Sequence, residues 1–81
     1  MQVKVFITPR KGILDPQGRV VEQSLKTLGF PEVSGVKVGK YIVLEVAAPS
    51  AAAAREETKR MCERLLANPN IEDFTFEVEG E

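Results

Sequence analysis

The chain has 81 residues, with 11 Lys and Arg against 12 Asp and Glu, so its formal net charge at pH 7 is −1. This length predicts one small domain over residues 1–81. The near-neutral charge excludes the general electrostatic attraction that draws basic proteins to nucleic acid or anionic membranes. Histidine is absent and Cys62 is the only cysteine, which excludes the usual general base near neutral pH, an internal disulfide and a Cys pair for zinc.

The first predicted element is a strand at the N-terminus. Val3, Val5 and Ile7 alternate with Lys4 and Phe6, the period-two pattern of a half-buried strand. This alternation lacks the continuous apolar run of a signal peptide, and no segment reaches membrane-spanning length. We therefore expect a soluble, cytoplasmic protein.

A helix is predicted next, beginning after Asp15. Asp15 is followed by Pro16, which suits an N-cap and a first helical residue, because the carboxylate accepts N–H groups that have no helical partner. The apolar positions that follow form one buried stripe, at Val21, Leu25 and Leu28. Gly29 stands where a left-handed C-cap is expected.

Residues 32–48 contain two strand-like runs on either side of Gly39 and Lys40. If Gly39 takes a positive φ, these two residues form a tight hairpin turn. The alternative is a bulge within one longer strand. Tyr41 and Val43 lie on one face of the second run, and Ile42 and its alternating partners lie on the other.

The last predicted elements are a helix and a strand. Pro49 and Ser50 end the preceding strand and cap the helix, which ends before Pro69. Its apolar spacing predicts a buried stripe at Ala54, Thr58, Met61 and Leu65. Residues 73–78 then alternate as a final strand. The Cys62 thiol is expected in the core or at an interface, because no neighbour in sequence would lower its pKa.

The resulting order is β-α-β-β-α-β, a ferredoxin-like α+β fold with an antiparallel sheet and two helices on one face. The other face meets water in such a fold and is expected to be polar. Here Phe6, Tyr41 and Val43 lie on it. We therefore expect another subunit to cover this face.

Three sets of residues admit a functional and a structural interpretation. Asp15 is a possible general base, but no histidine, second carboxylate or nucleophile stands beside it, so the helix cap is favoured. Arg10 and Lys11 precede a helix N-terminus and could hold an anion there. A solvated basic turn is the favoured interpretation for them. Gly39 and Lys40 could present a lysine to a partner, but turn chemistry alone explains them and is favoured.

The order and spacing of five blocks are similar to a known family. The blocks are VKVFIT, GILDPQG, LGFPEV, VKVGKYIVLEV and MCERLLANPNIEDFTFEV. Together they resemble the PurS-type small subunit of phosphoribosylformylglycinamidine (FGAM) synthase over nearly the whole chain. The resemblance includes the family's LDPxG turn at residues 14–18, its GKY segment at residues 39–41, and Asn68 and Pro69 at the end of the second helix.

The resemblance implies a non-catalytic subunit of a glutamine-dependent ligase in purine biosynthesis. Such a subunit bridges a glutaminase and an ATP-dependent synthetase and assists ammonia transfer, while the complex converts FGAR, glutamine and ATP into FGAM, glutamate, ADP and phosphate. The implied partners are these two subunits and further copies of the chain, as a homodimer or tetramer, with no nucleic acid and no membrane. ATP and Mg are used by the complex, and this subunit is expected to bind no cofactor and no metal and to have no catalytic residues of its own. The subunit-interface candidates are Phe6, Arg10, Lys11, Asp15, Gly39, Lys40, Tyr41 and Val43.

The same element order occurs in other classes of protein. ACT-like regulatory domains use it to bind small molecules, and this remains the alternative function. RNA-binding modules place stacked aromatic residues on the central strands over a basic surface. Here those strands offer only Tyr41 on a slightly acidic chain, which disfavours RNA binding.

Overall fold

The computed structural model describes residues 1–13 and 15–79. Leu14, which belongs to the GILDPQG block, and residues 80–81 lie outside the described part. The described elements are β1 (Gln2–Pro9), α1 (Pro16–Thr27), β2 (Lys40–Glu45), α2 (Ala51–Met61), the π-helical turn η1 (Cys62–Leu66) and β3 (Glu72–Val78). Within these residues, none of the helices is long and apolar enough to cross a membrane.

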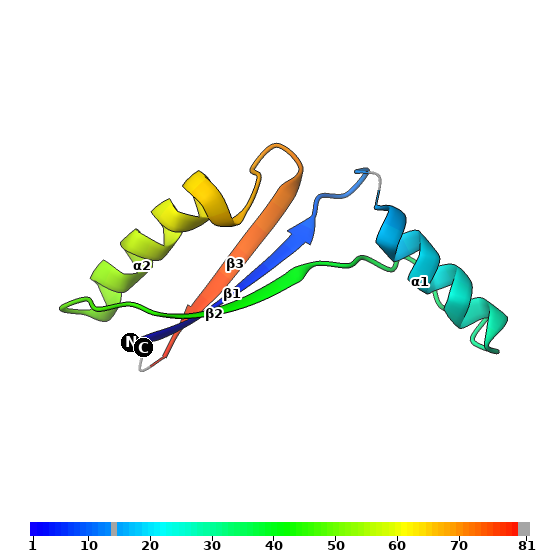
Figure 1. Ribbon diagram of the computed structural model, residues 1–81, viewed down its shortest axis with the longest axis horizontal. Helices are drawn as coiled ribbons and strands as arrows, with labels where there is room; N and C mark the ends of the chain where they lie inside the picture. The colour runs from blue at the N-terminus through cyan, green and yellow to red at the C-terminus, as the bar shows by residue number, and fades with distance from the viewer. Residues whose placement is uncertain (14, 80–81) are drawn as a thin grey trace.

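The three strands form one antiparallel sheet in the order β2-β1-β3, with α2 packed across one face (Figure 1). The alternating side chains of β1, Val3, Val5 and Ile7, are fully or almost fully buried beneath α2. Ala54 and Cys62 are buried with them in the same cluster. The predicted α+β class, with its antiparallel sheet and two helices, is confirmed.

The buried stripe of α2 differs from the predicted one. Ala54, Thr58 and Cys62, four residues apart, are fully buried, whereas Met61 and Leu65 are exposed. The predicted stripe was wrong at Met61 and Leu65, because the side that meets the sheet continues in steps of four into η1. The expectation that Cys62 lies in the core is confirmed. The helix begins as predicted, with the Ser50 side chain accepting a 3.2 Å hydrogen bond from the backbone N–H of Ala53.

The hairpin predicted at Gly39 and Lys40 does not form. Only Lys40–Glu45 is a strand, and residues 34–39 run towards it without a strand partner in the described part of the chain. The backbone N–H groups of Val36 and Val38 are bonded instead to the carboxylates of Glu22 and Asp15. Gly39 does not have a positive φ. It passes so close to β1 that a Cβ atom there would overlap the Ile7 carbonyl oxygen.

The position of α1 also differs from the ferredoxin-like expectation. Instead of lying beside α2 on the sheet, α1 projects beyond the end of β1 (Figure 1). Its contacts with the strands and with α2 are sparse. The radius of gyration is 15.9 Å, against about 12 Å expected for a compact domain of this length. The single chain is therefore elongated, and of the described elements only α2 and η1 cover the sheet.

Candidate interaction surfaces

The face of the sheet opposite α2 carries an exposed aromatic pair. Phe6 and Tyr41 are register partners on β1 and β2, and their rings stack with centroids 5.1 Å apart at an interplanar angle of 14°. Val43 lies two residues further along the same face and is paired with Lys4. All three apolar side chains are exposed, with Tyr41 57% accessible. The predicted apolar second face is thus present, and in the described residues it has no cover.

Charge pairs connect the strands at the end of the sheet where β1 ends and β3 begins. Lys40 Nζ lies 3.9 Å from Glu72 Oε2. Arg10 Nε lies 3.3 Å from Asp73 Oδ1, and the Arg10 backbone N–H donates a 2.8 Å hydrogen bond to the Ile71 carbonyl. Arg10 therefore connects the end of β1 to the start of β3 and is not simply a solvated turn residue.

A basic hollow of about 470 Å³ lies between the turn after β1 and the segment that follows α1. Arg10, Lys11, Arg19 and Lys37 line it, together with Asp15. Arg10 and Lys11 are the residues for which anion binding is one interpretation of the sequence. Asp15 already occupies the N-terminus of α1 with its own carboxylate, so the helix end does not offer free donors for a second anion.

The side chain of Asp15 bonds to two parts of the backbone. Its Oδ1 accepts a 3.1 Å hydrogen bond from the Gly18 N–H, and its Oδ2 accepts a 2.9 Å hydrogen bond from the Val38 N–H. The bond from Val38, followed by that from Gly18, holds the pKa of this carboxyl below its usual value. A carboxylate kept ionised in this way is a poor proton acceptor. The predicted N-cap is confirmed, and Asp15 additionally fastens the segment after α1 to the helix.

Glu22 makes the same kind of connection about two helical turns later. Its Oε1 accepts a 3.3 Å hydrogen bond from the Val36 N–H, and its Oε2 lies 3.4 Å from Lys26 Nζ. The Val36 hydrogen bond is the main reason that the pKa of Glu22 is lowered. Helix α1 and residues 28–38 thus form one unit, called here the α1 arm.

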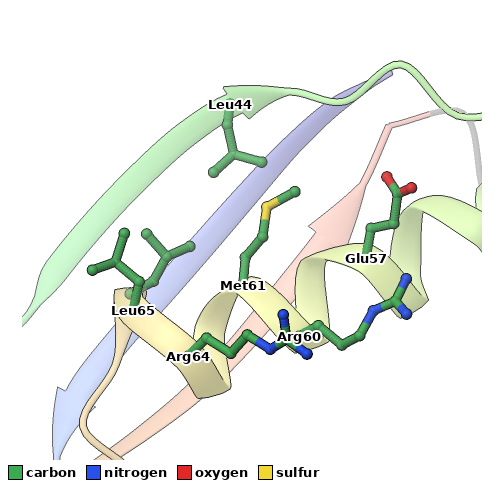
Figure 2. Close-up of a pocket in the computed structure, with 7 residues that line it drawn as sticks. Leu44, Glu57, Arg60, Met61, Arg64 and Leu65 are labelled. Carbon is green, nitrogen blue, oxygen red and sulfur yellow. The ribbon is translucent and has the colours of Figure 1, made fainter.

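A groove lies beside α2, on the covered side of the sheet. Its space is about 570 Å³. In Figure 2, Leu44 of β2 and Met61 of α2 point towards one another, and Arg60 and Arg64 extend along the outer side of the helix. The lining residues are Leu44, Glu57, Arg60, Met61, Arg64, Leu65 and Leu66. The sequence did not predict this groove, because Met61 and Leu65 were expected to be covered.

The eight predicted interface candidates lie in three neighbouring places. Phe6, Tyr41 and Val43 share the open sheet face, and Arg10, Lys11 and Asp15 line the basic hollow. Gly39 and Lys40 stand at the entry to β2 between these places. The eight candidates thus combine an exposed apolar sheet face with a charged hollow at the end of β1.

No group of three or more Cys, Asp or Glu side chains in residues 1–13 and 15–79 is arranged to hold a metal ion. Burial raises the pKa of the Cys62 thiol, and Glu63 raises it further.

Comparison with known proteins identifies one family. The family model PurS, described as phosphoribosylformylglycinamidine (FGAM) synthase, matches residues 2–80. The phosphoribosylformylglycinamidine synthase subunit PurS of Synechocystis is 43% identical over 75 residues, which cover 93% of this chain and 75% of that protein.

Solved structures agree with the sequence match. The Bacillus subtilis PurS structure superposes with a TM-score of 0.83 at 41% identity and covers 96% of both chains. A chain of the Thermotoga maritima PurLQS structure superposes with a TM-score of 0.80 at 33% identity, covering 95% of this chain and 96% of that one. The elongated arrangement of sheet and helix is thus similar to that of experimentally solved proteins.

Proposed function

This chain belongs to the PurS family of FGAM synthase subunits, and we propose that it bridges the glutaminase and ATP-dependent synthetase subunits of that enzyme and assists ammonia transfer between them. The complex uses FGAR, glutamine and ATP and forms FGAM, glutamate, ADP and phosphate, a step of purine biosynthesis. The full-length family match carries this proposal.

The chemistry of the chain supports a role in assembly rather than in catalysis. Glutamine hydrolysis needs an activated nucleophile, but the only thiol, Cys62, is buried and its pKa is raised. Asp15 is engaged by two backbone N–H groups. We propose that the bond-making steps occur on the other subunits, and that ATP and Mg bind there, with no cofactor on this chain.

The exposed surfaces support contact with several neighbours. We propose that the face with Phe6, Tyr41 and Val43 is covered by another subunit of the assembled enzyme, and that the chain also associates with itself as a dimer or tetramer. An exposed aromatic pair beside an aliphatic residue is typical of an interface centre. Charged residues, including Lys11, line the basic hollow that follows β1. As a subunit of a biosynthetic enzyme, the chain is proposed to act in the cytoplasm.

The test is the rate of FGAM formation by the glutaminase and synthetase subunits of the same organism, with and without this chain. Glutamine-driven synthesis should require the chain, and ammonia-driven synthesis should not. If neither rate responds to the chain, the bridging role is wrong. Isothermal titration with amino acids would then test the ACT-like alternative, which predicts binding heat where the bridging role predicts none.

A further inference from the structure

The basic hollow gathers cationic side chains from three separate segments of the chain. Arg10 and Lys11 come from the turn after β1. Arg19 comes from α1, and Lys37 comes from the residues that follow α1. Among the described lining residues, Asp15 alone is acidic. Positive charge is therefore concentrated here, although the chain as a whole has a net charge of −1, and such a surface attracts groups of the opposite charge.

Most of this positive charge has no partner in the described part of the chain. Arg10 is paired, because its Nε lies 3.3 Å from Asp73 Oδ1. Lys11, Arg19 and Lys37 are exposed and take part in no ion pair within residues 1–13 and 15–79. These three cations exceed the single carboxylate in the lining by two charges. The hollow thus has room for at least two acidic groups from outside the chain.

Hydrogen bonds fix the backbone on which two of these cations stand. Lys37 lies between Val36 and Val38 in the sequence, and the N–H groups of both neighbours donate to the α1 carboxylates described above, at 3.3 and 2.9 Å. The Arg10 N–H donates to the Ile71 carbonyl at 2.8 Å. Because these backbone positions are set before a partner arrives, less conformational entropy is lost when the hollow binds one.

The donors of the hollow suit carboxylates at its rim better than a compact phosphate inside it. Phosphate sites commonly use several free backbone N–H groups, often at a helix N-terminus. Here the Ile13 N–H donates to the Arg10 carbonyl at 3.1 Å, and those of Gly18 and Val38 donate to Asp15. The negative charge of Asp15 also opposes a dianion at the helix end. The side-chain ammonium and guanidinium groups remain, and these pair readily with carboxylates.

We propose that the basic hollow is a docking site for an acidic segment of the glutaminase or the synthetase subunit, whose Asp or Glu side chains pair with Lys11, Arg19 and Lys37. The hollow of about 470 Å³ is in the size range of pockets that enclose a drug-sized molecule, so it has space for more than one side chain. Ile13 and Val36 in its lining contact the aliphatic carbons of such side chains. This inference rests on the proposed bridging role and specifies the chemistry of one of its contacts.

Charge reversal tests the docking site. Sedimentation velocity measures the binding of the chain to the purified glutaminase and synthetase subunits of the same organism, with glutamine, ATP and Mg present. Lys37→Glu should weaken this binding by about tenfold. Added salt should weaken the binding of the wild-type chain more than that of the variant. The matched control is Lys59→Glu, which makes the same charge change at an exposed position of α2 outside the hollow and should bind like the wild type.

Two results of this experiment would contradict the proposal. Equal binding by Lys37→Glu and Lys59→Glu would overturn it, because the hollow would then make no contact with the partners. The circular dichroism spectrum and the sedimentation mass of the Lys37→Glu chain alone should match those of the wild type. A changed mass would overturn the proposal as well, since the hollow would then contact a second copy of the chain.

Carbodiimide cross-linking identifies the occupant of the hollow. The reagent joins a lysine amine to a carboxylate that contacts it, so mass spectrometry should find Lys11 or Lys37 linked to an Asp or Glu of one partner subunit, and this link shows which partner docks. Lys37→Arg keeps the charge and should keep the binding, but it should lose every link at position 37. Links from these two lysines only to a copy of the same chain, or no links, would overturn the proposal.

Isothermal titration with inorganic phosphate separates a protein segment from a small anion. Phosphate binding that is lost in Lys37→Glu would overturn the proposal in favour of a small-anion site, and no such binding is expected. The glutamine-driven rate decides the bridging role separately. If the subunits bind through the hollow without any change in this rate, the docking site stands and the bridging role is wrong. If the rate requires the chain but Lys37→Glu binds like the wild type, only the docking site is wrong.

Discussion

The sheet with α2 and the α1 arm differ in how much of their apolar surface the single chain covers. In the first region, Val3, Val5 and Ile7 are at most 1% exposed. In the second, Leu28 is 73% exposed, and residues 28–38 are connected to α1 by hydrogen bonds from their backbone to the carboxylates of Asp15 and Glu22. The first region is a packed core, whereas the second leaves apolar side chains of α1 exposed. The comparison teaches that an amphipathic pattern specifies that a face will be buried, without specifying which chain buries it.

The largest contrast between the two regions should come from truncating side chains. Ile7→Ala should lower the free energy of unfolding by about 2–5 kcal/mol, because it opens a cavity in a filled core. Val20→Ala, on the exposed side of α1, should change it by no more than about 0.5 kcal/mol. Urea unfolding at matched protein concentrations measures both. Equal losses for the two variants would break the distinction between a packed and an open region.

A buried hydroxyl gives a prediction of opposite sign in the packed region. Thr58 is fully buried, and its Oγ1 has no hydrogen-bond partner. Thr58→Val replaces this hydroxyl by a methyl group of similar shape, so it should raise the free energy of unfolding by about 1–3 kcal/mol. Thr58→Ser, which keeps the hydroxyl and loses the methyl group, should lower it. Stabilisation by both variants would show that the region is not tightly packed.

The α1 arm should respond to acid through its carboxylates. The pKa of Asp15 is lowered from its ordinary value of 3.8 by the hydrogen bonds from Val38 and Gly18. A lowered pKa in the folded state means that the stabilisation is present above about pH 4 and is lost as the pH falls through the folded pKa. The amide chemical shift of Val38, followed by NMR, should titrate with a midpoint below 3.8.

Two variants separate the connections made by the arm. Asp15→Asn should remove the acid titration at Val38 and leave that at Val36. Glu22→Gln should do the reverse, because Glu22 accepts from Val36. If the Val38 shift titrates unchanged in Asp15→Asn, this carboxylate does not hold residues 28–38 to α1.

Local patterns predicted local structure well in this chain. The pair of Asp15 and Pro16, and likewise Ser50, mark helix starts because a cap is a contact within three residues. The alternation in β1 also predicted its buried and open faces. The same reasoning failed at residues 32–39, where distant carboxylates take the N–H groups that a neighbouring strand would use. It also failed to place α1, because the spacing of Val21, Leu25 and Leu28 contains no information on the distance to the surface that they meet. The open sheet face was predictable from the pattern, but its role as an interface remains a prediction.

The smallest expected effect concerns that open face. Phe6 and Tyr41 stack with nothing described above them, so their coupling in the isolated chain should be about 0.5–1.5 kcal/mol. A double-mutant cycle with Phe6→Ala and Tyr41→Ala, read by urea unfolding, measures this coupling. In the assembled enzyme, the same variants should lower glutamine-driven synthesis by much more than this loss of stability explains, because a covered aromatic residue contributes to binding as well as to folding. Thr75→Ala, on the same face opposite Phe6, serves as the control, since it removes no aromatic surface. If the glutamine-driven rates of these variants fall only as far as their loss of stability explains, the aromatic pair supports the sheet, and the partners contact the chain elsewhere.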